Sequence, residues 1–214
     1  MHDKADTKPA DVALVLAGEA GQGIQTIESM LTRIAKRNSY HVFATKEYMS
    51  RVRGGCNSTE IRVSSRPVSA RVDRIDLLVA LSAAAVGHLG GRVGEGTLIV
   101  GEKELVGAEP MIDIPFTSIA GELGSPLYAN SVAAGAVAGL LGFDRAVGAS
   151  TARGLFDDKG EEVASANERA FLRGFELGAE MREGGTGAAS RLPALGPAAR
   201  EGGRPGEIGG AADG

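Results

Sequence analysis

The stretch Val12-Ala13-Leu14-Val15-Leu16-Ala17, followed by Gly18-Glu19-Ala20-Gly21-Gln22-Gly23, decides the fold. Its first half is a continuous apolar run, which is typical of a strand buried on both faces of a sheet. Its second half is a glycine-rich turn, after which apolar residues recur at helical spacing: Ile24, Ile27, Leu31 and Ile34. The stretch therefore predicts a strand–turn–helix unit.

The rest of the chain alternates in the same way. Strands are predicted at 40–44, 76–81 and 96–100, a weaker one at 111–114, and a half-exposed one at 60–64, where polar and apolar residues alternate. Helices are predicted at 83–89, 131–141, 146–156 and 161–182. Buried strands that alternate with helices predict a three-layer α/β fold: a mostly parallel, Rossmann-like open sheet with helices on both faces.

Glycine is the outlier of the composition. The chain has 214 residues and 32 glycines, about twice the usual share of ~7%. Many of these glycines lie after residue 183, where large apolar residues are few (Leu192, Leu195 and Ile208). We therefore expect a flexible N-terminus at 1–10, a folded domain at 11–182, and a disordered Gly/Ala/Pro-rich tail or linker at 183–214.

Charge and cysteine content exclude several classes of protein. The formal net charge of −4 argues against a nucleic-acid binder, which usually carries a basic face. The single cysteine, Cys56, allows no internal disulfide, and no Cys/His cluster offers a metal site. No signal peptide and no membrane-spanning stretch is present in the sequence. We expect a cytoplasmic protein that contacts neither membrane nor nucleic acid.

The turn at Gly18–Gly23 is the first candidate site. Gly21, Gln22 and Gly23 precede a helix N-terminus, whose free N–H groups suit a phosphate. An equally open interpretation is a tight turn in which glycines let the helix pack closely on the strand. The turn is not the dinucleotide fingerprint, because the third glycine of that motif would fall at Thr26.

The loop at 46–57 is the second candidate site. It should emerge at the same edge of the sheet as the first turn, and it carries Lys46, Arg51, Arg53, Gly54, Gly55 and Asn57. Arginine suits phosphate or carboxylate groups because its planar fork donates paired hydrogen bonds. The alternative, which composition alone favours, is that these cations are solvated or pair with a neighbouring subunit.

Catalytic chemistry is not apparent in the chain. Cys56 has no nearby histidine that could activate it, so a bystander thiol is expected. Asn130 and Asn167, on the late helices, are weak signals of packing or capping. We predict no catalytic residue and no metal ligand, and hence a chain that is not a catalyst by itself.

Several motifs together carry a resemblance to a known family. They are Gly18–Ile24, Glu47–Gly55, Thr59–Ser64, Val72–Leu78, and the later Asn130, Phe156, Lys159, Asn167, Ala170 and Gly174. In this order they resemble the gamma domain of 2-oxoacid:ferredoxin oxidoreductases over roughly residues 10–180. The first turn has Ala20 between Gly18 and Gly21. This form of the turn resembles that of chains in which the gamma domain is fused ahead of an alpha domain, often in 2-oxoglutarate-type enzymes.

The resemblance implies one component of a larger enzyme. Alpha, beta and gamma units of that family together decarboxylate a 2-oxoacid on thiamine diphosphate, pass electrons through iron–sulfur clusters to ferredoxin, and transfer the acyl group to coenzyme A. Thiamine diphosphate, Mg and 4Fe-4S clusters are then expected in partner subunits, and none is expected on this chain alone. The gamma domain is implicated in assembly and in covering the coenzyme A side, so the two glycine-rich loops could hold its phosphates.

Three other interpretations stay open at this point. The chain could be the beta subunit of an indolepyruvate-type ferredoxin oxidoreductase, although the motif around Glu47–Val52 usually differs there. It could be a free-standing module that binds coenzyme A or a nucleotide through Gly21–Gly23, Arg51 and Arg53. It could also be a purely structural domain whose two loops contact other subunits.

Overall fold

The predicted strand–turn–helix unit is present in the computed structural model, which describes residues 9–47, 55–184, 189 and 192–196. The strands are β1 (Asp11–Glu19), β2 (His41–Glu47), β3 (Cys56–Ser64), β4 (Leu77–Ala80), β5 (Leu98–Gly101) and β6 (Ile112–Asp113). The helices are α1 (Ile24–Arg37), α2 (Ala84–Leu89), α3 (Lys103–Val106), α4 (Phe116–Glu122), α5 (Ala129–Leu141), α6 (Arg145–Gly154) and α7 (Glu161–Glu183).

The strands form one six-stranded sheet in the order β2-β3-β1-β4-β5-β6. The β1–β4, β4–β5 and β5–β6 pairs are parallel, whereas β3 is antiparallel to both of its neighbours, β1 and β2. The prediction of a mostly parallel sheet is therefore confirmed, with β3 as the exception.

The strand predicted as half-exposed, β3, lies in the interior of the sheet. Its polar residues alternate with apolar ones, but ion pairs cover them: the Arg62 guanidinium bonds the Asp11 carboxylate at 2.8 and 2.9 Å, and the Glu60 carboxylate bonds Arg92 at 2.6 and 3.0 Å. The loop predicted at 46–57 is also shorter than expected, because β2 extends through Glu47 and β3 begins at Cys56.

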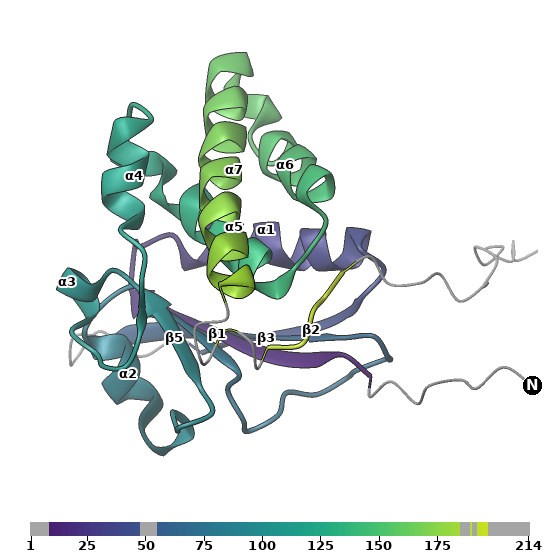
Figure 1. The fold of residues 1–214 in the computed structure, drawn as a ribbon, viewed down its shortest axis with the longest axis vertical. Coiled ribbons are helices and arrows are strands. Elements are labelled where there is room, and N and C mark those ends of the chain that lie inside the picture. The colour runs from purple at the N-terminus through teal and green to yellow at the C-terminus, as the bar shows by residue number, and fades with distance from the viewer. Residues whose placement is uncertain (1–8, 48–54, 185–188, 190–191, 197–214) are drawn as a thin grey trace, which may run out of the picture.

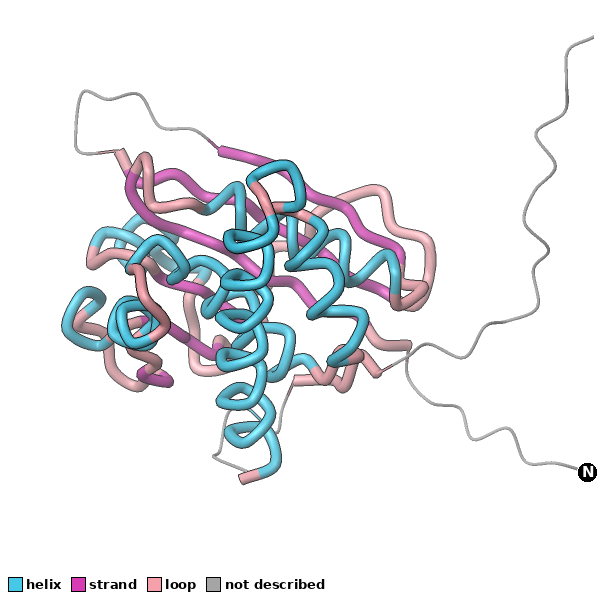
Figure 2. The backbone as a smooth tube through the Cα atoms, turned by 90° about the horizontal axis from the view of Figure 1, so that it is seen from above, coloured by secondary structure: helices cyan, strands magenta, loops and turns pink. Residues whose placement is uncertain are grey.

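Helices cover both faces of the sheet, as predicted, but unevenly. Figure 1 shows α1, α5, α6 and α7 on one face and α2 on the other. In Figure 2, seen from above, the helices of the thicker layer overlie the strands. On the thinner side, Ala85 and Leu89 of α2 and Val106 of α3 belong to a small core with apolar residues of β1, β4 and β5.

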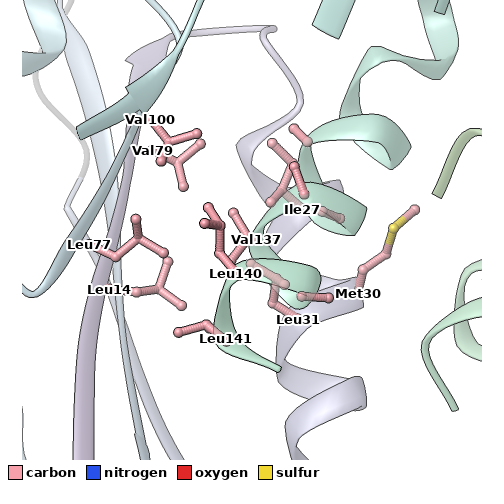
Figure 3. Close-up of a cluster of buried hydrophobic side chains, with 14 of the residues drawn as sticks. Leu14, Ile27, Met30, Leu31, Leu77, Val79, Val100, Val137, Leu140 and Leu141 are labelled. Carbon is pink, nitrogen blue, oxygen red and sulfur yellow. The ribbon is translucent and has the colours of Figure 1, made fainter. Parts of the chain in front are cut away.

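The main core lies between the sheet and helices α1 and α5. Figure 3 shows Leu14, Leu77, Val79 and Val100 of the strands facing Val137, Leu140 and Leu141 of α5, with Ile27, Met30 and Leu31 of α1 beside them. Eleven of the thirteen α5 residues are buried, because the sheet, α1 and α7 surround this helix. Burial on all sides explains why its sequence is apolar all round rather than striped.

Helices α5 and α7 touch backbone to backbone through two pairs of glycines four residues apart. A Cβ atom added to Gly135 or Gly174 would lie 2.0 Å from the carbonyl oxygen of Phe171 or Val132, respectively. Gly139 and Gly178 face Phe175 and Ala136 in the same way. Part of the glycine excess therefore serves helix packing, a use that the sequence reasoning missed.

The expected tail at 183–214 requires a correction. Helix α7 continues through Glu183, and Leu192 and Leu195 are buried against the core. The Leu195 N–H donates to the Leu141 carbonyl, and the Tyr40 hydroxyl donates to the Gly196 carbonyl at 2.8 Å. Burial of these two leucines, at about 1.5–3 kcal/mol each, and the two hydrogen bonds stabilise the described residues of this segment against the core. Residues 197–214 lie outside the described residues.

The expected flexible N-terminus, 1–10, lies mostly outside the described residues. Ala10 belongs to the folded part, because it packs against the core and its carbonyl accepts a hydrogen bond from the Ser65 N–H at 2.9 Å. No helix in the described part of the chain has both the length and the hydropathy needed to cross a bilayer.

Candidate functional site at the carboxyl edge of the sheet

The turn between β1 and α1 depends on two glycines in the left-handed region. Gly21 has a φ of +93° and Gly23, which precedes the first residue of α1, a φ of +78°. Other L-residues adopt this region only with strain. These two positions let the chain reverse from the end of β1 into α1 within four residues, so the helix begins at the edge of the sheet.

Gln22 holds this turn against the rest of the sheet. Its side-chain oxygen accepts a hydrogen bond from the Glu19 N–H at 2.6 Å, and its amide nitrogen donates to the carbonyl of Leu81, directly after β4, at 2.9 Å. Gly18 leaves room for this arrangement, since a Cβ there would lie 2.5 Å from the Gln22 side-chain oxygen. Both the oxygen and the nitrogen of the Gln22 side chain thus form hydrogen bonds within the chain. Gln22 therefore has a structural role, and so does Gly18, which makes room for its side chain.

The N-terminus of α1 carries no capping side chain and no acidic residue in its first turn, whereas Lys36 and Arg37 lie in its last turn. The positive end of the helix dipole is therefore not neutralised by the described side chains of its own helix. Such an end can accept an anion through backbone N–H groups.

Asn130, a weak signal in the sequence, lies at the same place. Its side-chain amide packs against Gly23 so closely that a Cβ at Gly23 would lie 1.9 Å from the amide nitrogen. The neighbouring Ser131 hydroxyl donates to the Asn167 side-chain oxygen at 2.6 Å, and the Asn167 amide donates to the Val163 carbonyl. The two asparagines thus join the starts of α1, α5 and α7, which is the packing role anticipated for them.

A pocket of about 310 Å³ opens beside the turn. Its walls come from the turn, the first residues of α1 and the first half of β3: Glu19, Ala20, Gly21, Gly23, Ile24, Gln25, Thr26, Asn57, Ser58 and Thr59. This volume lies at the lower end of the range for ligand pockets, so there is room for a phosphate group or a short polar group beside the turn.

The predicted second loop is described only in part. Asn57 lies in β3 opposite Gly18 of β1 and lines the pocket, so the structure brings it together with the predicted Gly21 and Gly23. Gly55 is half-buried and immediately precedes β3. Arg51, Arg53 and Gly54 lie outside the described residues, so their predicted role in binding stays a prediction.

The first cation of that loop, Lys46, belongs to β2 and forms an ion pair within the chain. Its ammonium group lies 2.8 Å from the Glu28 carboxylate of α1. The Glu28 side chain is only 13% exposed, so this pair is partly shielded from solvent. This ion pair within the chain was not among the interpretations of Lys46 from the sequence, which considered a ligand, solvent or a neighbouring subunit.

Cys56 is buried at the start of β3. Burial raises the pKa of its thiol; a hydrogen bond with the Gly18 backbone lowers it less strongly, and the Glu19 carboxylate raises it further. A raised pKa keeps the thiol protonated and unreactive, in line with the bystander role. Among the described residues, no group of three or more His, Cys, Asp or Glu side chains could hold a metal ion.

Comparisons with known proteins agree on one family. Residues 13–177 match the family model described as pyruvate ferredoxin/flavodoxin oxidoreductase. A relative from Archaeoglobus fulgidus, named 2-oxoglutarate synthase subunit KorC, is 30% identical over 79% of this chain and 89% of its own length.

Two solved structures share the fold. One is 2-oxoglutarate:ferredoxin oxidoreductase from Magnetococcus marinus with 2-oxoglutarate, coenzyme A and succinyl-CoA bound. It is 25% identical with a TM-score of 0.70, over 80% of this chain and 31% of that one. The other is the gamma subunit of a keto/oxoacid ferredoxin oxidoreductase from Geobacter sulfurreducens, 22% identical with a TM-score of 0.65, over 78% of this chain and 98% of that one. The fold therefore occurs both as nearly the whole of a chain and as part of a longer one.

Proposed function

Because this chain belongs to the pyruvate ferredoxin/flavodoxin oxidoreductase family, we propose that it is the gamma component of a 2-oxoglutarate-type 2-oxoacid:ferredoxin oxidoreductase. The observation that carries the proposal is the match to KorC over most of both chains. Of the alternatives considered from the sequence, an indolepyruvate-type subunit and a free-standing nucleotide module have no comparable support.

The proposed enzyme oxidatively decarboxylates 2-oxoglutarate or a similar 2-oxoacid, with coenzyme A as acyl acceptor and ferredoxin as electron acceptor. Thiamine diphosphate with Mg would supply the decarboxylation chemistry and 4Fe-4S clusters the path for electrons. The described residues do not fit a cluster, since Cys56 is a single buried thiol and no other ligand set accompanies it. We propose that the alpha and beta subunits hold these groups, and that the assembled enzyme is cytoplasmic.

The contribution of this chain, in this proposal, is assembly and the coenzyme A side of the site. Coenzyme A carries several phosphates, and the uncapped N-terminus of α1 beside a polar pocket suits one of them. Thr26, Asn57 and Thr59 line that pocket and could donate hydrogen bonds to phosphate oxygens. Arg51 and Arg53 would add charge-assisted hydrogen bonds to the same ligand.

Reconstitution tests the subunit assignment. Alpha and beta subunits from the same source should reduce ferredoxin in the presence of 2-oxoglutarate and coenzyme A when this chain is added. Without it, or with it alone, the rate should be at background. Full activity of the alpha and beta subunits without this chain would overturn the proposal.

Two variants of the assembled enzyme test the coenzyme A role. Arg53→Ala should raise the KM for coenzyme A about tenfold or more with assembly intact, because a hydrogen bond to a charged group is worth ~1.5–3 kcal/mol. Asn57→Ala should act in the same direction, whereas Ser65→Ala, just beyond the other end of β3 and exposed, should change nothing. Loss of assembly by Arg53→Ala would instead favour a purely structural loop, and an unchanged KM in the assembled enzyme would contradict the coenzyme A role.

A further inference from the structure

Strand β2 is the outer strand on one side of the sheet in the described part of the chain. It has seven residues, whereas β6 at the other end has two. Pairing with β3 runs without interruption from His41 opposite Ser64 to Glu47 opposite Ser58. Among the residues that the structure describes, no strand pairs with the other edge of β2. The sheet therefore presents a regular row of backbone donors and acceptors.

The usual devices that protect a sheet edge are weak in β2. The strand contains no proline and no glycine, and its uninterrupted register shows no bulge. Val42, Phe43 and Thr45 favour extended structure and are half-buried. Lys46 is the type of residue that often blocks an edge, but its ammonium group is held by Glu28 of the adjacent helix. An edge of this kind can accept another strand.

We propose that β2 docks antiparallel on β2 of a second copy of this chain, about a two-fold axis at Ala44. Ala44 is the middle residue of the strand, so this register pairs all seven residues. It sets His41 opposite Glu47, Phe43 opposite Thr45 and Val42 opposite Lys46, and each of these pairs occurs twice. Two such sheets would join into one continuous sheet of twelve strands, twice the six of one chain.

Complementarity within β2 itself selects a second copy as the occupant. The two-fold register brings the His41 imidazole against the Glu47 carboxylate at both ends, and a β-branched residue against an aromatic one between them. A two-fold register centred on Lys46 would instead oppose like charges at its centre. His41, Ala44 and Glu47 are exposed, so these side chains are accessible to the second copy. The inference is independent of the proposed enzymatic function.

Sedimentation velocity on the full chain tests the proposal. The wild-type protein should have twice the 21.9 kDa mass of one chain. Ala44→Glu and Ala44→Lys should each sediment as a single chain, because they place like charges opposite each other at the axis. Mixing the two variants in equal amounts should restore the double mass, since each axis then joins a Glu to a Lys. Ala146→Glu and Ala146→Lys change an exposed alanine of α6 and should leave the double mass unchanged.

Three results would overturn the proposal. The first is a wild-type protein of single mass at the highest concentration at which it stays soluble. The second is a double mass for both Ala44 variants, or its loss in the Ala146 controls. The third is a pair of Ala44 variants that each show a single mass but fail to associate when mixed. Circular dichroism of each variant checks that the fold is retained, as expected for exposed positions.

Discussion

Replacing Gly174 by alanine would force the two central helices of the thick layer apart. The added methyl group would lie 2.0 Å from the Val132 carbonyl oxygen and 3.0 Å from the Ala136 nitrogen. Both atoms belong to the backbone of α5, so no side chain can rotate away. Because real Cβ contacts stay above 3.0 Å, α5 and α7 must separate locally by at least 1.0 Å, the difference between these two distances.

Two opposing effects set the size of the loss. Overpacking a tight interior costs about 1–3 kcal/mol, and a clash with backbone belongs at the upper end of that range. Alanine is favoured over glycine inside a helix by roughly 1 kcal/mol. We therefore expect Gly174→Ala to lower the free energy of unfolding by about 2 kcal/mol, which corresponds to a Tm decrease of roughly 4–8 °C for a chain of this size.

Gly87 provides a matched control for the Gly174→Ala substitution. Gly87 also lies within a helix, α2, but a Cβ there would meet no atom within 4 Å. Gly87→Ala should therefore leave stability unchanged or raise it by up to about 1 kcal/mol. Urea unfolding of the full chain, followed by circular dichroism, measures both variants. A Gly174→Ala protein as stable as wild type would refute the backbone contact between α5 and α7.

Three further substitutions test other parts of the structure by the same unfolding assay. Gln22→Ala removes both hydrogen bonds that hold the first turn and should lower the free energy of unfolding by about 1–3 kcal/mol; no change would mean that the turn is held by its glycines alone. Leu195→Ala should lower it by about 2–5 kcal/mol if the C-terminal segment docks as described, and an unchanged midpoint would show that it does not. Burial raises the pKa of the Glu60 carboxyl, but Arg92 and Arg71 lower it more, so its folded pKa lies below the unfolded value of 4.5. Its stabilising contribution is then complete above pH 4.5 and disappears as the pH falls through the folded pKa. Glu60→Gln should consequently be destabilised relative to wild type at pH 7 and less so at pH 3; a difference that does not depend on pH would contradict this pairing.

Most of the fold could be predicted because its buried strands are short, continuous apolar runs. Residues 12–17, 76–81 and 96–100 each overlap a strand of the parallel part of the sheet: β1, β4 and β5, respectively. The alternating strand β3 was placed correctly, but its interior position was not predictable. The partners that cover its charges, Asp11 and Arg92, lie far away in the sequence, so local alternation resembles that of a half-exposed strand.

Predictions from composition alone were wrong for the start of the C-terminal segment and missed the packing role of the helix glycines. A Gly/Ala/Pro-rich stretch predicts disorder, yet Leu192 and Leu195 within it are buried, and Leu195 and Gly196 form hydrogen bonds with Leu141 and Tyr40, respectively. Gly135 and Gly139 of α5 and Gly174 and Gly178 of α7 allow the two helices to touch. This role depends on the tertiary contact, so composition could not predict it.

The candidate site was predicted in part. The glycine turn and Asn57 were selected from the sequence and do come together around one pocket. The hydrogen bonds of Gln22 to Glu19 and Leu81 and the contact of Asn130 with Gly23 depend on the tertiary fold. In the sequence, the only indications of these interactions were a polar residue inside a glycine-rich turn and an asparagine at the start of a predicted helix.

The central claim, that this chain is a gamma component, is tested most directly by affinity purification of the tagged chain from its native cells. Mass spectrometry of the eluate identifies the proteins that it retains. We predict alpha-like and beta-like subunits in comparable amounts, in a fraction that reduces ferredoxin when given 2-oxoglutarate and coenzyme A. A chain that elutes without such subunits, and without this activity, would contradict the account.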